Sequence, residues 1–173
     1  MKVFSSQFRL ELLALGLMGL LSPSAGAAPI VAPTMIEIPP GRVVMGADRA
    51  EWAAGEDEFP RHEVRVQKSF RLSQTQVTRG AYLAFVVATD YGSQGGCRVS
   101  SDAGWVDDRR ADWRTPGYAQ SDLHPVVCVS WTDARAYIDW LNEESGGSYR
   151  LPTESEWALA ARAGAKGRNF WGD

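Results

Sequence analysis

The feature that most constrains the fold is the stretch 149–173, because it carries a strong signal for the start of a helix. Thr153 and Glu156 stand three residues apart, as in a capping box, where the hydroxyl and the carboxylate each accept a hydrogen bond from a backbone N–H group of the first turn. Pro152 lies just ahead of the cap and biases Leu151 towards an extended backbone. We therefore expect a helix that begins at a sharp corner after a strand or turn.

One face of this expected helix combines small residues with a single large one. Its members recur at helical spacing and are Trp157, Ala160, Ala161 and Gly164. Because the indole is the one large apolar group on this face, we predict that Trp157 anchors the helix to a core. Gly164 and Gly167 are expected to end the helix, since glycine favours helix ends over helix interiors.

The composition indicates a globular domain that is poor in long regular elements. Among 173 residues there are seven tryptophans and seventeen glycines. Many large aromatic side chains set among many turn-permitting glycines predict a loop-rich fold held by aromatic anchors. The net charge of -3 offers no general field for a nucleic acid or an anionic membrane, so neither is expected as a partner.

The first residues have the pattern of a secretory signal peptide. Lys2 and Arg9 precede an apolar run at 12–21, and the small residues 25–27 resemble a cleavage site. The apolar run is too short to cross a bilayer, which takes about twenty residues. We predict a signal peptide over residues 1–27 and a periplasmic or secreted protein without a membrane span after cleavage; a retained amphipathic anchor is the alternative.

The next part of the chain predicts short strands. Residues 28–38 are expected to form a linker and a first strand, with the strand at 35–38. A turn at 39–41 then leads to a second strand at 43–45. Residues 62–66 alternate between polar and apolar side chains and predict a half-buried strand.

Two further helices are expected. Thr78 is the predicted N-cap of an amphipathic helix that runs through Tyr82 and Phe85. Ser130, with Asp133 three residues later, is the predicted N-cap of a helix that extends to Gly146. The apolar run ahead of Ser130, from residue 124, is interpreted as a buried strand.

Between these helices, residues 91–125 lack periodicity, which is typical of a functional or disordered loop. Its tryptophans favour an ordered one. The charge run 107–110 is interpreted as a solvated turn. On the strand before this region, His62 suggests metal binding or proton transfer, but with no second ligand at metal spacing it is interpreted as a packed or hydrogen-bonded structural residue.

The run Arg-Leu-Pro-Thr-Glu-x-Glu-Trp-x-x-Ala-Ala-Arg at 150–162, followed by Trp-Gly-Asp at 171–173, resembles the signature of the formylglycine-generating, or sulfatase-modifying-factor, family. Relatives in that family include sulfoxide synthases of ergothioneine synthesis and chromophore-maturation proteins of siderophore pathways. The resemblance covers most of 39–173, with departures at Gln76 and Arg79. The signature positions, interpreted as structural, are His62, Thr78, His124, Pro125, Ser130, Trp131, Arg150, Leu151, Pro152, Thr153, Glu154, Glu156, Trp157, Arg162, Trp171 and Gly172.

This resemblance implies an α+β, C-type-lectin-like fold that is loop-rich and has a groove for a peptide. It also implies copper, held by a cysteine pair, and calcium as the cofactors of the intact family. Because that cysteine pair lies beyond the matching part of the family, 39–173 is expected to be the N-terminal portion of the domain, without assigned catalytic or cofactor-binding residues. Asp173 stands where a family calcium site begins and is at best an orphan ligand.

The two cysteines, Cys97 and Cys128, are expected to form a disulfide, because an exported protein with an even number of cysteines most simply pairs them. Free or differently paired thiols are a second possibility. A two-thiolate copper site is a third, since soft Cu(I) prefers thiolates.

Three functions are consistent with these features. The first is an exported member of the family, related to enzymes that oxidise a client sulfatase cysteine to formylglycine. The second is a non-catalytic module that binds a peptide or glycan through Trp105, Trp113 and Tyr118, although core packing is expected for most of these side chains. The third is a truncated remnant, in which the faces covered by Trp157 and Tyr137 become exposed.

Overall fold

A computed structural model describes residues 32–51, 54–102 and 104–165. The predicted signal peptide and the residues Trp171, Gly172 and Asp173 lie outside this part. The described elements are, in order, β1 (Met35–Ile38), β2 (Gly41–Met45), a 3₁₀ turn (Glu56–Glu58), β3 (His62–Val66), β4 (Phe70–Ser73), α1 (Arg79–Thr89), β5 (Cys97–Ser101), β6 (Gly104–Asp108), α2 (Trp131–Ser145) and α3 (Glu154–Arg162). The fold is therefore α+β and loop-rich, as expected.

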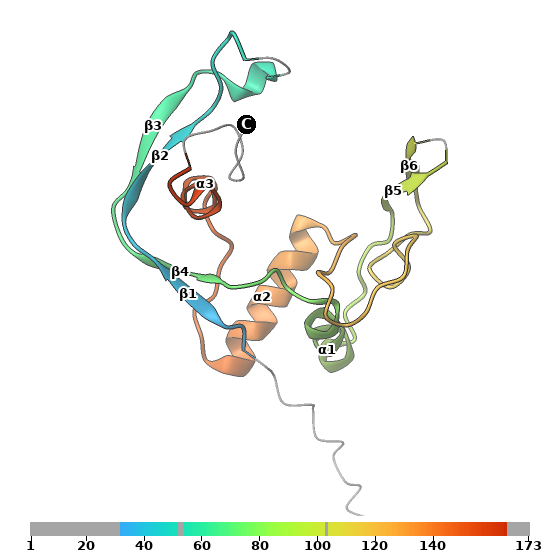
Figure 1. Cartoon of the computed structure of the whole chain (residues 1–173). Helices are drawn as coiled ribbons and strands as arrows, with labels where there is room; N and C mark the ends of the chain where they lie inside the picture. Colours follow the sequence, from blue (N-terminus) through green and yellow to red (C-terminus); the bar gives the residue numbers. More distant parts are fainter. Residues whose placement is uncertain (1–31, 52–53, 103, 166–173) are drawn as a thin grey trace, which may run out of the picture.

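Two antiparallel strand pairs follow one another as a single curved ribbon (Figure 1). β1 pairs with β4, and β2 pairs with β3, with Gly41 opposite Val66 and Met45 opposite His62. The predicted strands near 35–38 and 43–45 are thus present, but they pair with later strands and no turn separates them. Pro39 and Pro40 link them, and because proline favours an extended backbone and lacks an N–H group, the ladder is interrupted while the chain keeps its direction.

The core lies between α1 and α2 and is mainly aromatic. Tyr82 and Phe85 of α1 meet Tyr137 and Trp140 of α2, and Trp113 joins them from the irregular segment. The rings of Tyr82 and Trp113 form an edge-to-face pair with centroids 5.2 Å apart. Such pairs stabilise by about 0.5–1.5 kcal/mol beyond the burial of their area. The core therefore fixes the two helices and one point of the loop between them.

The three predicted N-caps are confirmed. The Thr78 hydroxyl accepts a hydrogen bond from the Ala81 amide at 3.2 Å, and Ser130 and Thr153 each belong to a complete capping box. α2 ends at Gly146 in the left-handed region, as expected for glycine. α3 ends one residue earlier than predicted, with Ala163 in the left-handed region.

Two predictions for the middle of the chain are wrong. The segment 91–125 is not irregular throughout, because β5 and β6 form an antiparallel pair within it. The charge run 107–110 begins on β6 and only its second half is a turn. Both errors have one cause: Val99 and Val106 are the only apolar pair across this ladder, so the hydropathy of the segment hardly alternates.

The apolar run after residue 124 is also not a strand. It makes a single antiparallel bridge, between Thr78 and Pro125, and the Val126 amide donates to the Val77 carbonyl at 2.9 Å. Pro125 lacks the N–H group that a longer ladder needs. The run instead lies beside the start of α1 and leads into α2.

Trp157 does not anchor α3 to the core, contrary to the prediction, because its side chain is 60% exposed. α3 lies in the concave side of the curved ribbon and contacts β2 and β3 (Figure 1). Leu159 makes this contact, since a Cβ atom on Gly41 would come within 2.9 Å of its Cδ1 atom. The helix is attached through the face opposite to the predicted one.

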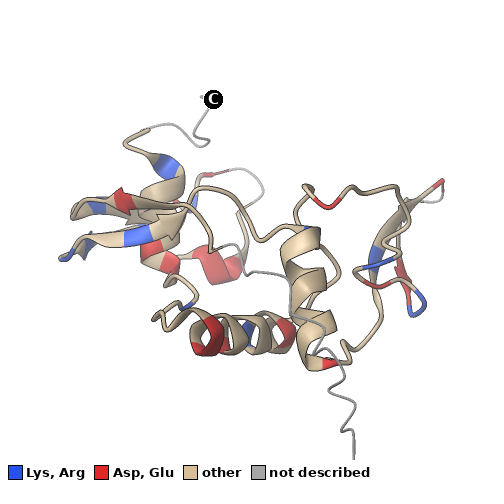
Figure 2. Cartoon of the chain, turned by 90° about the horizontal axis from the view of Figure 1, so that it is seen from below, with Lys and Arg blue, Asp and Glu red and all other residues tan. Residues whose placement is uncertain are grey.

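No helix in the described ranges is long and apolar enough to cross a membrane. Acidic and basic residues are interspersed on the ribbon and on α2 (Figure 2). This mixed distribution agrees with the small net charge of -3.

Candidate functional site

The most exposed aromatic side chain of the long segment stands on the β5–β6 arm (residues 97–108), which projects away from α1 and α2 (Figure 1). Val99 faces the body of the protein, because a Cβ atom on Gly117 would lie 3.6 Å from its own. Side chains alternate along a strand, so Trp105, opposite Ser100, belongs to the other face. Trp105 is 66% exposed, and the arm therefore presents an indole to the solvent.

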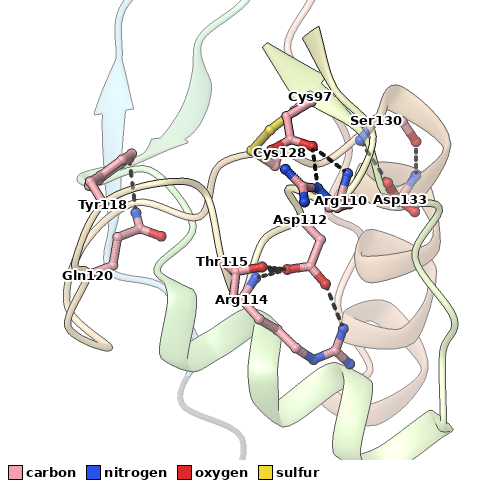
Figure 3. Close-up of a disulfide and its surroundings, with 11 residues drawn as sticks. Cys97, Arg110, Asp112, Arg114, Thr115, Tyr118, Gln120, Cys128, Ser130 and Asp133 are labelled. Carbon is pink, nitrogen blue, oxygen red and sulfur yellow. Dashed lines mark hydrogen bonds and ion pairs between the residues drawn. A yellow bond between two sulfur atoms is a disulfide. The ribbon is translucent and has the colours of Figure 1, made fainter. Parts of the chain in front are cut away.

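A disulfide between Cys97 and Cys128 holds the base of this arm (Figure 3). Cys97 is the first residue of β5, and Cys128 lies two residues before Ser130, the N-cap of α2. Cys128 has a φ of 56°, in the left-handed region that few non-glycine residues adopt. The cross-link thus connects the arm to a tight bend at the start of α2. The two sulfur atoms are 2.05 Å apart in this structure.

Asp112 organises the turn that follows the arm. Its carboxylate accepts hydrogen bonds from the Arg114 and Thr115 amides, both at 2.8 Å, and from the Thr115 hydroxyl at 3.0 Å (Figure 3). Partial burial acts to raise the pKa of Asp112, but these hydrogen bonds outweigh it and lower the pKa below its usual value. The turn places Trp113 in the core while the Arg114 guanidinium lies over its ring, 4.3 Å from the centroid.

Tyr118 is the second exposed aromatic residue of the segment, with 57% of its surface accessible. Its hydroxyl accepts a hydrogen bond of 3.3 Å from the Gln120 amide, which also donates to the Pro125 carbonyl at 2.9 Å. Of the three aromatic residues proposed as ligand contacts, Trp113 is therefore part of the core, whereas Trp105 and Tyr118 are exposed. The expectation that most of them pack in the core is wrong.

Sequence reasoning did not single out Trp131 as an exposed contact residue, although it is 67% exposed. The buried positions of α2 are Asp133, Tyr137, Trp140 and Leu141. Trp131 and Arg135 fall outside this stripe and lie one turn apart, with the guanidinium 5.2 Å from the ring centroid. The buried residues of α2 recur at the helical period. This period was the sequence signal by which Trp131 could have been predicted to point towards the solvent.

The family-signature positions form local structural groups. The first joins the start of α1 to the segment before α2: the Arg79 amide donates to the His124 carbonyl at 2.8 Å, next to the bridge between Thr78 and Pro125. The His124 Nδ1 atom accepts a hydrogen bond of 2.9 Å from the Ser121 amide, which fixes the ring in a turn. These contacts position the backbone where α1 begins.

The second group surrounds the N-terminus of α3, which follows Leu151 and Pro152. The Arg150 guanidinium makes two hydrogen bonds of 2.7 Å to the Glu156 carboxylate, which also accepts from the Thr153 amide at 2.8 Å. Arg150 and then Thr153 hold the pKa of Glu156 down to about 2. Glu154 lies in the same first turn, where the helix dipole favours an acid, and Arg162 ends the helix, where it favours a base.

His62 lies on β3 and its Nδ1 atom is 2.9 Å from the Pro60 carbonyl, which agrees with a hydrogen-bonded structural residue. Within the described ranges, no group of three His, Cys, Asp or Glu side chains is arranged to hold a metal ion. Cys97 and Cys128 do not fit a two-thiolate copper site here, since their sulfur atoms are bonded to each other. Asp173, the suggested calcium ligand, lies outside the described residues.

Comparisons with known proteins identify the family of the chain. Residues 22–173 match the family described as "Sulfatase-modifying factor enzyme 1-like domain". The formylglycine-generating enzyme of Streptomyces coelicolor is 36% identical, over 87% of this chain and 54% of its own length. A bovine protein named inactive C-alpha-formylglycine-generating enzyme 2 is 34% identical, over 80% of this chain and 52% of its own.

Among solved structures, PvdO from Pseudomonas aeruginosa is similar in fold, with a TM-score of 0.63 and 33% identity over 79% of this chain and 50% of its own. The chain thus spans about half the length of the relatives that it matches. It belongs to the sulfatase-modifying factor enzyme 1-like domain family.

Proposed function

We propose that this chain is an exported member of the family that contributes the client-binding part of a cysteine-oxidising domain. The client is a sulfatase or similar protein in which a cysteine becomes formylglycine. The observation that carries the proposal is the 36% identity to the formylglycine-generating enzyme of Streptomyces coelicolor over 87% of this chain. Export is proposed from the signal-like pattern of residues 1–27.

Within this function, the exposed aromatic residues contact the client. Trp105 on the arm and Tyr118 in the following loop are both more than half exposed. Large aromatic side chains supply much of the binding energy at peptide and protein interfaces, because they bury a large area at little cost in conformational entropy. The disulfide at the base of the arm limits the conformations that the arm can adopt before binding. The entropy lost when the arm becomes ordered on binding is therefore smaller.

A binding measurement tests this role. We expect the chain to bind a fluorescently labelled Cys-x-Pro-x-Arg peptide, the client sequence that the resemblance to the formylglycine-generating family implies. The substitution Trp105→Ala is expected to weaken this binding by about tenfold, the effect of losing 1.4 kcal/mol. Val87→Ala is the matched control, since Val87 is an exposed apolar residue on α1. Binding that both variants weaken equally, or that neither weakens, would contradict a contact role for Trp105.

A non-catalytic peptide- or glycan-binding module is the second candidate, and the 34% identity to the bovine protein named as inactive favours it. The two candidates differ in product. An aldehyde-reactive probe reports formylglycine in the peptide after incubation in air with copper and a protein in which this chain replaces the matched part of the Streptomyces coelicolor enzyme. Binding with aldehyde formation by this fusion supports the oxidising domain, whereas binding without it supports the module.

A further inference from the structure

Both ends of the β5–β6 arm are attached to the core by contacts that do not involve the disulfide. Before β5, the Tyr91 hydroxyl donates a hydrogen bond of 3.0 Å to the buried carboxylate of Asp133. The hydroxyls of Ser93 and Tyr82 share a second hydrogen bond of 2.8 Å. After β6, Trp113 is fully buried among the rings of α1 and α2. These attachments remain when the disulfide opens, so we expect the aromatic core to stay folded without it.

Between these attachments, the arm is loosely packed on the body of the protein. The Gly96 amide donates to the Ala111 carbonyl at 2.7 Å, and Val99 lies against Gly117. An open cavity of about 330 Å³ nevertheless lies beneath the arm, lined in part by Val99, Ala111 and Gly117. Gly96 has a φ of 103°, which glycine adopts without steric cost, and it directly precedes Cys97. The disulfide is therefore the strongest single constraint on a hinge at the base of the arm (Figure 3).

The other cysteine of the pair lies in a bend that costs free energy. Cys128 has a φ of 56°, and a non-glycine residue keeps such a left-handed backbone only where the surrounding structure enforces it. The bond to Cys97 on one side and the capping box of Ser130 on the other enforce it here. Reduction removes one of these constraints and lets the bend relax. Neither cysteine is buried, so a thiol can reach the bond, and exposed disulfides are the ones that exchange readily.

We propose that the Cys97–Cys128 bond is a redox latch that fixes the arm in its client-binding position. The latch opens when a dithiol reductant attacks one sulfur atom, releases the other as a thiol through a mixed disulfide, and then closes its own disulfide. The chain gains two electrons and two protons, and the reductant loses them. The released arm no longer holds Trp105 in place, so the affinity for the client falls. The effect on binding rests on the proposed function, whereas the opening of the arm does not.

Hydrogen exchange under controlled redox conditions tests the latch. The chain is measured oxidised, after reduction with dithiothreitol, and after reoxidation with glutathione disulfide, while alkylation with mass spectrometry counts the thiols in each state. We expect reduction to accelerate exchange in β5 and β6 more than in α1 and α2, and reoxidation to reverse this change. The double variant Cys97→Ser, Cys128→Ser is the matched control, which should exchange like the reduced chain and not respond to dithiothreitol. Unchanged exchange in β5 and β6, equal acceleration in both regions, or a chain that does not form the bond on reoxidation overturns the proposal.

Peptide binding provides the second measurement. The probe is the labelled client peptide with serine in place of its cysteine, because this peptide cannot exchange with the disulfide. We expect reduction to weaken its binding by about tenfold, as is expected of Trp105→Ala, since both changes remove the same contact. Reduction of the Trp105→Ala variant should then cause little further loss. A reduced wild type that binds as tightly as the oxidised one overturns the latch as a control of binding. An oxidised chain that does not bind the peptide counts against the proposed function only, and hydrogen exchange still decides whether the arm is released.

Discussion

The α1–α2 core and the β5–β6 arm are held in place by different kinds of interaction. The core consists of several aromatic rings with centroids 4.9–6.1 Å apart, so many contacts share the task of fixing the two helices. Among the described strands, β5 and β6 of the arm pair with each other, and the disulfide and the Val99–Gly117 contact join the arm to the body. We therefore expect the loss of one contact to change the stability of the two regions by different amounts.

The core provides the largest expected effect. Trp113→Ala removes a fully buried indole that contacts Tyr82, and is expected to lower the free energy of unfolding by about 3–5 kcal/mol. Urea denaturation measures this loss. Trp113→Phe is the sharper control: the Trp113 Nε1 atom has no hydrogen-bond partner in the described structure, so removing it relieves a buried unsatisfied donor and reduces the loss. Equal losses for both variants would contradict this account.

The next largest effect is expected from removing the disulfide, and the same experiment tests whether this bond forms. The cysteines are separated by 31 positions, and closing a loop of this size stabilises the fold by about 3–4 kcal/mol on the entropic estimate. We expect the double variant Cys97→Ser, Cys128→Ser to lose this amount. Mass spectrometry of the protein purified without reductant checks for two missing hydrogen atoms. A full-length species with two alkylatable thiols would show that the pair is not oxidised.

If the core and the arm are independent, the double serine variant should destabilise the arm alone. Hydrogen exchange tests this, because it measures the protection of backbone amides in each region separately. Amides of β5 and β6 are expected to exchange faster in the variant, whereas those of α1 and α2 are expected to keep their order of protection, because the aromatic core does not depend on the cross-link. Uniformly faster exchange would mean that the arm and the core unfold as one unit.

The features that the sequence predicts well are local ones. Thr78, Ser130 and Thr153 were identified as N-caps because capping depends on residues three positions apart, which is information that a sequence contains directly. The proposed pairing of Cys97 with Cys128 rests on the number of cysteines alone and stays a prediction. The family resemblance and the α+β fold rested on such local patterns as well.

The errors concern interactions between distant parts of the chain. Nothing local distinguishes a tryptophan that enters the core, such as Trp113, from one that stays exposed, such as Trp105. The face of α3 that is used depends on Gly41, more than a hundred residues earlier in the chain, which leaves room for Leu159. Likewise, β1 and β2 are predictable as strands, whereas their pairing with β4 and β3 depends on the whole ribbon.

The smallest expected effects are at the N-terminus of α3, which belongs to neither region. Thr153→Ala removes a capping hydroxyl and is expected to cost about 1 kcal/mol in urea denaturation. Thr153→Ser keeps the hydroxyl and is the control. A loss of the same size in the serine variant would assign the effect to the methyl group of Thr153 and not to its cap.

The same cap makes a prediction about pH. Hydrogen bonds from Arg150 and Thr153 lower the pKa of Glu156 from 4.5 to about 2, so the folded state binds the proton more weakly than the unfolded state does. The stabilisation by Glu156 is therefore complete above about pH 4.5, decreases as the pH falls towards 2, and is absent below that value. Urea midpoints of the wild type and of Glu156→Gln are expected to differ at pH 7 and to converge towards pH 2. A constant difference would mean that the hydrogen-bond geometry of Glu156, and not its charge, stabilises the helix.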